Sequence, residues 1–182
     1  AIGKGNIAYA LETLDVDDDG VEEIIVGTSK RSSDSLGTHV YAINAEDGSL
    51  AWASQTLDDN YMESNLDIPI ADINNHGTSK ILVSSSKYLS ILNSTTGEVI
   101  DKIAGTFNAI DSMQLDSDEA LEFITAKDNF IRIYDGDSLT SQEEITLCDE
   151  DIKAIKAIGN DKIVVACGSE LVRYDFLLNS VD

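Results

Sequence analysis

Short apolar runs recur along the chain, and each follows a polar turn. The first runs from Glu23 to Val26, and the later ones begin at Lys80, Glu122 and Lys162, so their starts are 57, 42 and 40 residues apart. A second apolar run follows each of these and closes on Asn or Asp, with nearly the same spacings. The closing residues are Asn44, Asn93, Asp135 and Asp175. Because the two series of apolar runs recur with nearly the same spacing, they predict four repeats.

The runs are rich in Val, Ile, Leu and Tyr and are bounded by turns such as Asp-Gly and Thr-Gly, a composition typical of β-strands joined by hairpins. No segment keeps a helical period over helical length, so we predict an all-β chain. We expect strands near 8–15, 22–28, 38–44 and 50–57, near 66–73, 80–86, 88–93 and 98–104, near 109–115, 121–126, 129–135 and 142–147, and near 152–158, 162–167 and 170–175.

A repeat of about 40 to 57 residues with four strands has the size of one β-propeller blade. We therefore predict one propeller domain over 1–182, with blades near 8–57, 66–104, 109–147 and 152–182. The fourth repeat shows no clear fourth strand. Residues 1–7 could supply it in a closed four-bladed ring; otherwise the chain is part of a six- to eight-bladed ring completed by further blades or subunits. An open fragment exposes strand edges and needs a partner.

An acidic loop stands out between the first two expected strands, from Asp15 to Glu23. Carboxylates at alternate positions, a glycine for a sharp turn and a further acid can surround a hard cation such as Ca²⁺. An EF-hand is excluded because its twelfth position, a bidentate Glu, is Val26 here, and because the flanking segments are strands.

The sequence from Asp15 to Gly27, Asp-x-Asp-x-Asp-Gly-x-x-Glu-Ile-Ile-Val-Gly, resembles the FG-GAP/VCBS repeat of β-propellers. The resemblance implies a calcium cofactor, and the alternative is a solvated acidic turn that only caps a hairpin. The ligands that the family pattern implies are the side chains of Asp15, Asp17, Asp19 and Glu23 and the carbonyl of Val21.

The other copies of this loop depart from the pattern. In the second, Asp72 and Asn74 remain but His76 and Lys80 replace acids, so we expect no metal there. The fourth, around Lys162, has lost the site. In the third we expect weak binding, because Gln114 replaces the first Asp and the loop is expected to be one residue shorter near the glycine position. Its candidate ligands are Asp116, Asp118 and Glu122.

A second resemblance lies at Ala42–Trp52, which is similar to the blade consensus of quinoprotein-like (PQQ-like) propellers. It implies that Gly48 forms a tight turn and that Trp52 docks one blade against its neighbour. It also keeps open a PQQ-type or hydrolytic propeller enzyme. No catalytic constellation is readable around the two histidines, His39 and His76, which we expect to be structural.

The net charge and the apolar runs limit the classes of function that the chain can have. With 34 Asp+Glu against 12 Lys+Arg the net charge is -22, which argues against nucleic-acid binding through a basic surface. No apolar run approaches the roughly 20 residues of a membrane span. The acidity and a calcium loop suit an extracellular or periplasmic location.

For Cys148 and Cys167 we expect buried or free thiols rather than a disulfide.

Recognition is the function that these observations favour. We expect a non-catalytic interaction or adhesion module with a protein or glycan partner, and the alternatives are a scaffold subunit of a larger complex or a propeller enzyme. Two long connections in the first repeat interval supply candidate contact residues, because loops on a rigid scaffold often carry function. These candidates are Lys30, Arg31, Tyr61 and Met62.

Overall fold

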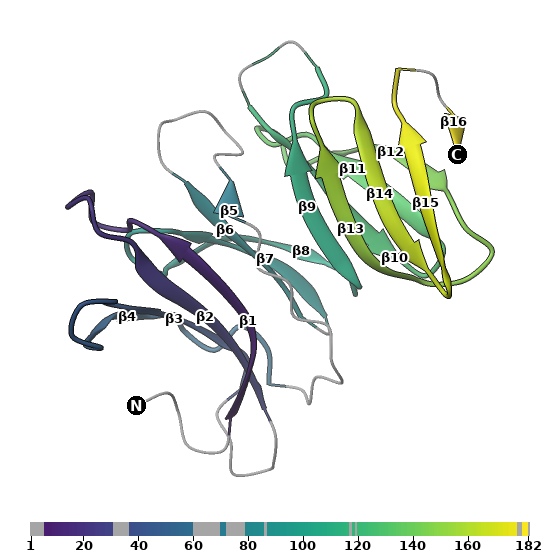
Figure 1. Ribbon diagram of the computed structural model, residues 1–182. Coiled ribbons are helices and arrows are strands. Elements are labelled where there is room, and N and C mark those ends of the chain that lie inside the picture. The colour runs from purple at the N-terminus through teal and green to yellow at the C-terminus, as the bar shows by residue number, and fades with distance from the viewer. Residues whose placement is uncertain are drawn as a thin grey trace. The chain divides into compact units, whose positions relative to one another are not determined.

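The computed structural model describes residues 6–30, 37–59, 70–71, 79–85, 87–116, 118, 120–177 and 180–181. Its elements in this part of the chain are all strands, arranged as four antiparallel sheets of four strands each (Figure 1). Within each sheet the strands lie side by side in chain order. The prediction of an all-β chain with four repeats is therefore confirmed. We name the sheets blades 1 to 4.

Most strands lie close to the expected ranges because the apolar runs and their turns fix both ends, but the strand expected near 50–57 ends at Ala53. Blade 1 contains β1 (Asn6–Leu14), β2 (Glu23–Lys30), β3 (His39–Ile43) and β4 (Leu50–Ala53), and blade 2 contains β5 (Ile70–Ala71), β6 (Lys80–Ser84), β7 (Tyr88–Asn93) and β8 (Val99–Ala104). Blade 3 contains β9 (Ala109–Met113), β10 (Glu122–Lys127), β11 (Phe130–Tyr134) and β12 (Ser141–Thr146), and blade 4 contains β13 (Ile152–Ile158), β14 (Lys162–Cys167), β15 (Glu170–Asp175) and β16 (Ser180–Val181).

Blade 4 has a fourth strand of its own. Tyr174 and Asp175 in β15 pair with Val181 and Ser180 in β16. Residues 6–7, which we considered as a donor for this strand, pair with β2 inside blade 1. The expectation that blade 4 lacks its own fourth strand was wrong because a two-residue strand leaves almost no apolar pattern to detect.

The closing Asn and Asp residues have a structural reason. The side chain of Asn44 accepts the backbone N–H of Glu46 at 2.8 Å, and that of Asn93 accepts the N–H of Thr95 at 2.9 Å. Asp135 does the same for Ser138 at 2.7 Å. Short polar side chains mimic a backbone turn in this way, so these residues recur wherever the third strand of a blade turns toward the fourth.

The chain forms two compact units, residues 1–70 with 79–106 and residues 71–78 with 107–182. In the first unit, blades 1 and 2 share a core. Blade 1 contributes Ile25, Val40 and Trp52, and blade 2 contributes Ile81 and Val83. The prediction of a single domain over 1–182 stays a prediction.

The second unit has its own core between blades 3 and 4. Ile124, Ile131 and Ile133 from blade 3 pack with Ile163 and Val165 from blade 4. Of these five side chains, only Ile133 retains measurable exposure, at 3%. Within each unit the two sheets thus bury a shared apolar core between them, which is the main source of the unit's stability.

Trp52 joins blade 1 to blade 2, as the blade consensus implied. It is 9% exposed, and a Cβ placed on Gly97, in the turn between β7 and β8, would collide with its indole ring. Gly97 has φ +70°, and Gly48, in the turn between β3 and β4, has a similar φ of +72°. A Cβ at Gly48 would meet only open space. Gly97 is therefore required both by its backbone conformation and by the contact.

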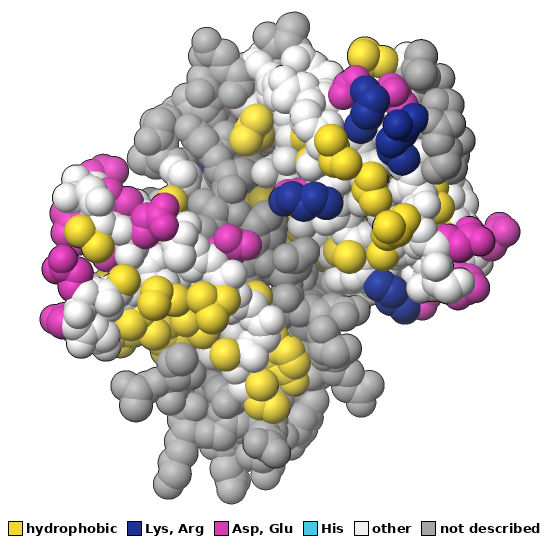
Figure 2. All heavy atoms as spheres, viewed as in Figure 1, with side chains coloured by type: hydrophobic (Ala, Val, Ile, Leu, Met, Phe, Trp, Pro, Cys, Tyr) yellow, Lys and Arg dark blue, Asp and Glu magenta, His cyan; other side chains and the backbone are white. Residues whose placement is uncertain are grey.

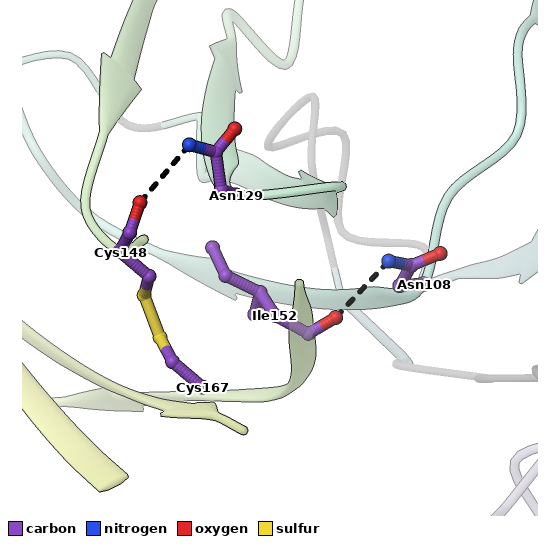
Figure 3. The surroundings of a disulfide bond; sticks show 5 residues. All are labelled: Asn108, Asn129, Cys148, Ile152 and Cys167. Atoms are coloured by element: carbon purple, nitrogen blue, oxygen red, sulfur yellow. Dashed lines mark hydrogen bonds between the residues drawn. A yellow bond between two sulfur atoms is a disulfide. The ribbon is translucent and has the colours of Figure 1, made fainter. Parts of the chain in front are cut away.

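Cys148 and Cys167 form a disulfide, which corrects the expectation of thiols (Figure 3). Their Cα atoms are 6.2 Å apart, within the range for a disulfide. The bond joins the segment before β13 to the end of β14. Beside it, the Asn129 side chain donates to the Cys148 carbonyl at 3.0 Å, and Asn108 donates to the Ile152 carbonyl at 3.0 Å. The disulfide thus fixes the segment before β13 to β14, and the two hydrogen bonds connect this segment and β13 to Asn129 and Asn108 of blade 3.

Candidate functional site

The acidic loop of blade 1 gathers three of its predicted ligands. One carboxylate oxygen from each of Asp15, Asp17 and Asp19 lies within 4.8 Å of the others. Asp15 is half-buried, whereas Asp17 and Asp19 are exposed. This spacing allows one hard cation to contact all three groups, and carboxylate oxygens are the ligands that Ca²⁺ prefers.

Backbone N–H groups hold this loop in shape. The two oxygens of Asp15 accept the N–H groups of Asp19, at 3.2 Å, and Gly20, at 2.8 Å. Asp19 accepts the N–H of Val21 at 2.8 Å. The chain turns through left-handed conformations at Asp18, with φ 60°, and at Gly20, with φ 89°. The glycine in the motif is thus placed where the backbone needs it.

Glu23 has a different position from the three aspartates. It is 1% exposed, and its Oε2 accepts the N–H of Val16 at 3.0 Å across the loop. Among the described acids, it is outside the group whose oxygens lie within 4.8 Å of one another. Its carboxylate therefore closes the loop onto the start of β2, and its role as a ligand stays a prediction, as does that of the Val21 carbonyl.

The third loop repeats this architecture. Glu122 is 1% exposed, and its Oε2 accepts the N–H of Leu115 at 2.6 Å, seven residues earlier, as Glu23 does for Val16. The loop therefore has the same length as the first, and the expectation that it is one residue shorter was wrong. Here Asp116, Asp118 and Glu122 bring their oxygens within 4.8 Å of one another.

Two buried oxygens in this third loop lack a hydrogen-bond partner in the described part of the chain. They are Oε1 of Glu122 and Oε1 of Gln114. The amide of Gln114 donates to the Asp118 carbonyl, so its oxygen belongs to the same loop as the acidic cluster. An unpaired buried polar atom costs free energy, and a bound cation would remove that cost. The residues of this loop thus fit a hard cation.

The environment of Glu122 also affects its protonation. Burial raises the pKa of Glu122 above its ordinary value, and the nearby charges of Asp116 and Asp118 raise it further, although the hydrogen bond from Leu115 acts in the opposite direction. The loop therefore holds negative charge at an energetic cost. A divalent cation would favour the charged form and reverse the direction of this shift.

The other two copies differ. Asp72, Asn74 and His76 of the second loop lie outside the described residues, and Lys80 is buried. In the fourth copy, the Lys162 ammonium contacts the carboxylate of Asp161 and lies 3.4 Å from that of Asp175. A cation of the protein thus occupies the position where the first loop has Glu23.

Three candidate contact residues, Arg31, Tyr61 and Met62, lie outside the described residues, and Lys30 is described only as the last residue of β2. His39 has a structural setting: it is 8% exposed, its Nδ1 lies 2.8 Å from the Gly37 carbonyl, and its Nε2 lies 3.2 Å from the Thr56 hydroxyl. These contacts connect β3 to Gly37, just before it, and to Thr56, which follows β4.

A pocket of about 460 Å³ lies beside the disulfide, lined by both cysteines and by acids that include Asp149, Glu150 and Glu170. Sequence reasoning did not predict it, because it depends on two loops that are distant along the chain. In the part of the chain that is described, no helix is long and apolar enough to cross a membrane.

Comparison with known proteins gives the fold. No protein-family model matches the chain, and no curated protein matches it in a sequence search. Among solved structures, the WD40 repeats of RRP9 match with TM-score 0.66 at 10% identity, over 98% of this chain and 53% of theirs. BBS1N, solved in complex with ARL6DN, matches with TM-score 0.68 at 12% identity, over 96% and 52%.

Sqt1 of Saccharomyces cerevisiae matches with TM-score 0.66 at 12% identity, over 96% of this chain and 47% of its own. The chain spans about half the length of the solved structures that it matches. At these identities the likeness concerns the fold and not the activity. Together with the four consecutive antiparallel sheets, it shows that the chain has the β-propeller fold.

Proposed function

We propose that the chain is a non-catalytic protein-interaction module built on the β-propeller fold, and that Ca²⁺ stabilises two of its blade loops. The observation that carries the calcium proposal is the third loop, where a buried carboxylate oxygen without a hydrogen-bond partner belongs to a group of converging acids. The likeness of the first loop to FG-GAP/VCBS repeats supports the same cofactor there.

The proposed ligands follow the two loops. In the first they are Asp15, Asp17 and Asp19, with Glu23 and the carbonyl of Val21 completing the set that the resemblance implies. In the third they are Asp116, Asp118 and Glu122, and the buried oxygen of Gln114 takes the place of the first Asp. The cation would neutralise carboxylates that otherwise repel one another, and so hold the first strand of each blade to the second.

The interaction role rests on the fold and on the surface. β-propellers are rigid scaffolds with several accessible faces, and this chain exposes large apolar side chains: Leu11 in blade 1 is 64% exposed and Leu171 in blade 4 is 75% exposed. BBS1N, a solved structure of the same fold, was crystallised with a protein partner. The disulfide supports a further proposal, an extracellular or periplasmic location, because such bonds persist in oxidising compartments.

Thermal unfolding with Ca²⁺ and with EGTA, at equal ionic strength, tests the cofactor. Calcium at about 100 times its Kd is expected to stabilise the chain by about 2.7 kcal/mol per site. The variants Asp17→Asn and Asp116→Asn should each lose part of this gain, whereas Glu46→Gln, an exposed acid outside both loops, should keep it. Equal unfolding temperatures with calcium and with EGTA would overturn the calcium proposal.

Affinity capture from the source extract tests the interaction role. The wild-type chain and the variants Leu11→Asp and Leu171→Asp are compared, and retained proteins are identified by mass spectrometry. We expect at least one protein that the wild type retains and one of these variants loses. Retention of the same proteins by all three chains and by a heat-unfolded control contradicts a role in specific recognition.

A further inference from the structure

The strand pairing gives equivalent residues in different blades. The third residue of the second strand pairs with Glu12 in blade 1, with Asp111 in blade 3 and with Lys156 in blade 4. These three residues are therefore equivalent positions on the first strands. Directly paired residues share a face of their sheet, so the register also shows which side chains lie on each face.

In blades 1 and 3 one face of the sheet packs on the next blade, and we call this face, and the equivalent face of blade 4, the forward face. In blade 1 it carries Ile25 and Val40, which pack against blade 2. In blade 3 it carries Ile124 and Ile131, which pack against blade 4. All four side chains are 0% exposed. In both described blade pairs the forward face is thus buried by the blade that follows.

The forward face of blade 4 is exposed. Leu171, the equivalent of Ile131 in the third strand, is 75% exposed, and Ile158 at the end of β13 is 49% exposed. The same face carries Lys156 and Arg173, both exposed. Figure 2 shows this mixture of hydrophobic and Lys or Arg side chains over β13, β14 and β15. Apolar positions that are fully buried in the other blades are thus open here.

We call the opposite face the backward face, and in blade 4 it packs on blade 3. In blade 4 it carries Ile155, which is 7% exposed against blade 3. Its equivalent in blade 1 is Leu11, because Leu11 and Ile155 pair with the equivalent residues Val26 and Val165. Leu11 is 64% exposed. Figure 2 shows hydrophobic side chains over β1.

A charge contact between first strands accompanies the apolar contact between blades 3 and 4. Where blade 3 meets blade 4, Asp111 accepts the N–H of Ala157 at 2.7 Å and lies 3.1 Å from the Lys156 ammonium. The contact thus joins an acid on one first strand to the equivalent position on the next. If blade 4 is followed by a blade 1, the same rule places Lys156 beside Glu12. Lys156, which already contacts Asp111 of its own chain, would then lie between two acids.

We propose that the forward face of blade 4 docks on the backward face of blade 1 of a second copy of the chain, head to tail. Leu171 and Ile158 would then be covered as Ile131 and Met113 are, and Lys156 would pair with Glu12. Two copies would supply about the length of the propellers that the chain half covers. The proposal rests on the interaction role proposed above, because it names a second copy as the partner of the surfaces that carry Leu11 and Leu171. It is independent of calcium binding.

Light scattering of the purified chain tests this proposal. We expect twice the monomer mass of 19.7 kDa for the wild type and for Ile100→Asp, a matched change at a 52% exposed position on β8, away from both faces. Leu11→Asp and Leu171→Asp should each be monomeric, because each spoils one side of both junctions. A mixture of these two variants keeps one junction intact and should regain mixed dimers.

A charge exchange tests the register itself. Glu12→Lys and Lys156→Glu should each weaken the dimer, whereas their mixture restores opposite charges at both junctions. Circular dichroism shows that each variant is folded. A wild-type chain that stays monomeric at about 100 μM overturns the proposal, and so does a dimer that survives Leu171→Asp. Mixtures that behave as their separate components also contradict it, because a head-to-tail contact requires complementation.

Discussion

At Glu122 one carboxylate serves two purposes. One oxygen closes the third loop through the N–H of Leu115, and the other is buried without a hydrogen-bond partner among the described residues. The hydrogen bond from Leu115 stabilises the folded loop, whereas the buried oxygen without a partner costs free energy. A residue that only shaped the loop would not need a charge, since a glutamine could accept the same N–H. A bound cation would therefore explain why this position carries a carboxylate.

This contrast predicts an opposite effect of Glu122→Gln with and without calcium. In EGTA the variant removes a buried charge, so it should be at least as stable as the wild type. In Ca²⁺ it loses a ligand and should be the less stable of the two. Urea unfolding of both chains in the two buffers measures this reversal. A variant that is less stable by the same amount in both buffers contradicts the ligand role.

The raised pKa of Glu122 predicts a pH dependence in EGTA. Because the folded chain binds this proton more tightly than the unfolded chain, the contribution of Glu122 to stability is lost as the pH rises. The loss begins near the ordinary value of 4.5 and is complete above the raised pKa. Glu122→Gln lacks this titration, so the difference between the two chains isolates it. The free energy of unfolding of Glu122→Gln, relative to that of the wild type, should therefore increase as the pH rises.

Gly97 and Gly48 provide a matched pair of alanine substitutions. Both have φ near +70°, so each alanine costs roughly 1–2 kcal/mol in backbone strain. At Gly97 the new methyl also collides with Trp52, which adds about 1–3 kcal/mol of overpacking. Gly97→Ala should therefore lower the free energy of unfolding more than Gly48→Ala. Equal losses would show that Trp52 moves aside without cost.

At the scale of elements, the sequence predicts the long apolar strands well and the shortest strands poorly. β13, β14 and β15 agree with their expected ranges at both ends because apolar residues and turns mark them. β16, with two residues, escapes because hydrogen bonding to β15 defines it and no pattern does. Strands of this kind follow from the sheet rather than from their own composition.

The sequence likewise predicts some of the sites better than others. The acidic loops were predictable because their ligands are neighbours along the chain. The disulfide was not, because Cys148 and Cys167 are 19 residues apart and meet only once β13 pairs with β14. The burial of Glu122 in the third loop was not predicted either, since it depends on the core beneath it. Local spacing thus predicts candidate ligand sets, whereas burial follows from the fold.

The disulfide closes a loop that contains β13 and most of β14. For a separation of 19 residues the chain-entropy model gives about 3 kcal/mol of stabilisation. We expect Cys148→Ala with Cys167→Ala, or a reducing agent, to lower the free energy of unfolding by about this amount. Urea unfolding of the oxidised, reduced and double-variant chains measures it. Similar stability in all three would contradict a structural role for the bond.

For the whole molecule, the net charge of -22 is the dominant electrostatic term. The acids of the two loops and the exposed surface repel one another, and folding brings them closer together. The cations are few, and several are already paired, as Lys162 is with Asp161 and Lys156 with Asp111. Salt and calcium should therefore both stabilise the chain, by different mechanisms.

A salt series separates these mechanisms. Between about 0.01 M and 0.15 M ionic strength the screening length falls from about 30 Å to about 8 Å, so NaCl should raise the unfolding temperature in EGTA. Asp17→Asn and Asp116→Asn should show nearly the same rise, because each removes only one of 34 acids. Calcium at constant ionic strength should then add a further rise that these variants lose in part. If NaCl at equal ionic strength reproduces the whole calcium effect, the loops bind no specific cation and the acids act only through their summed charge.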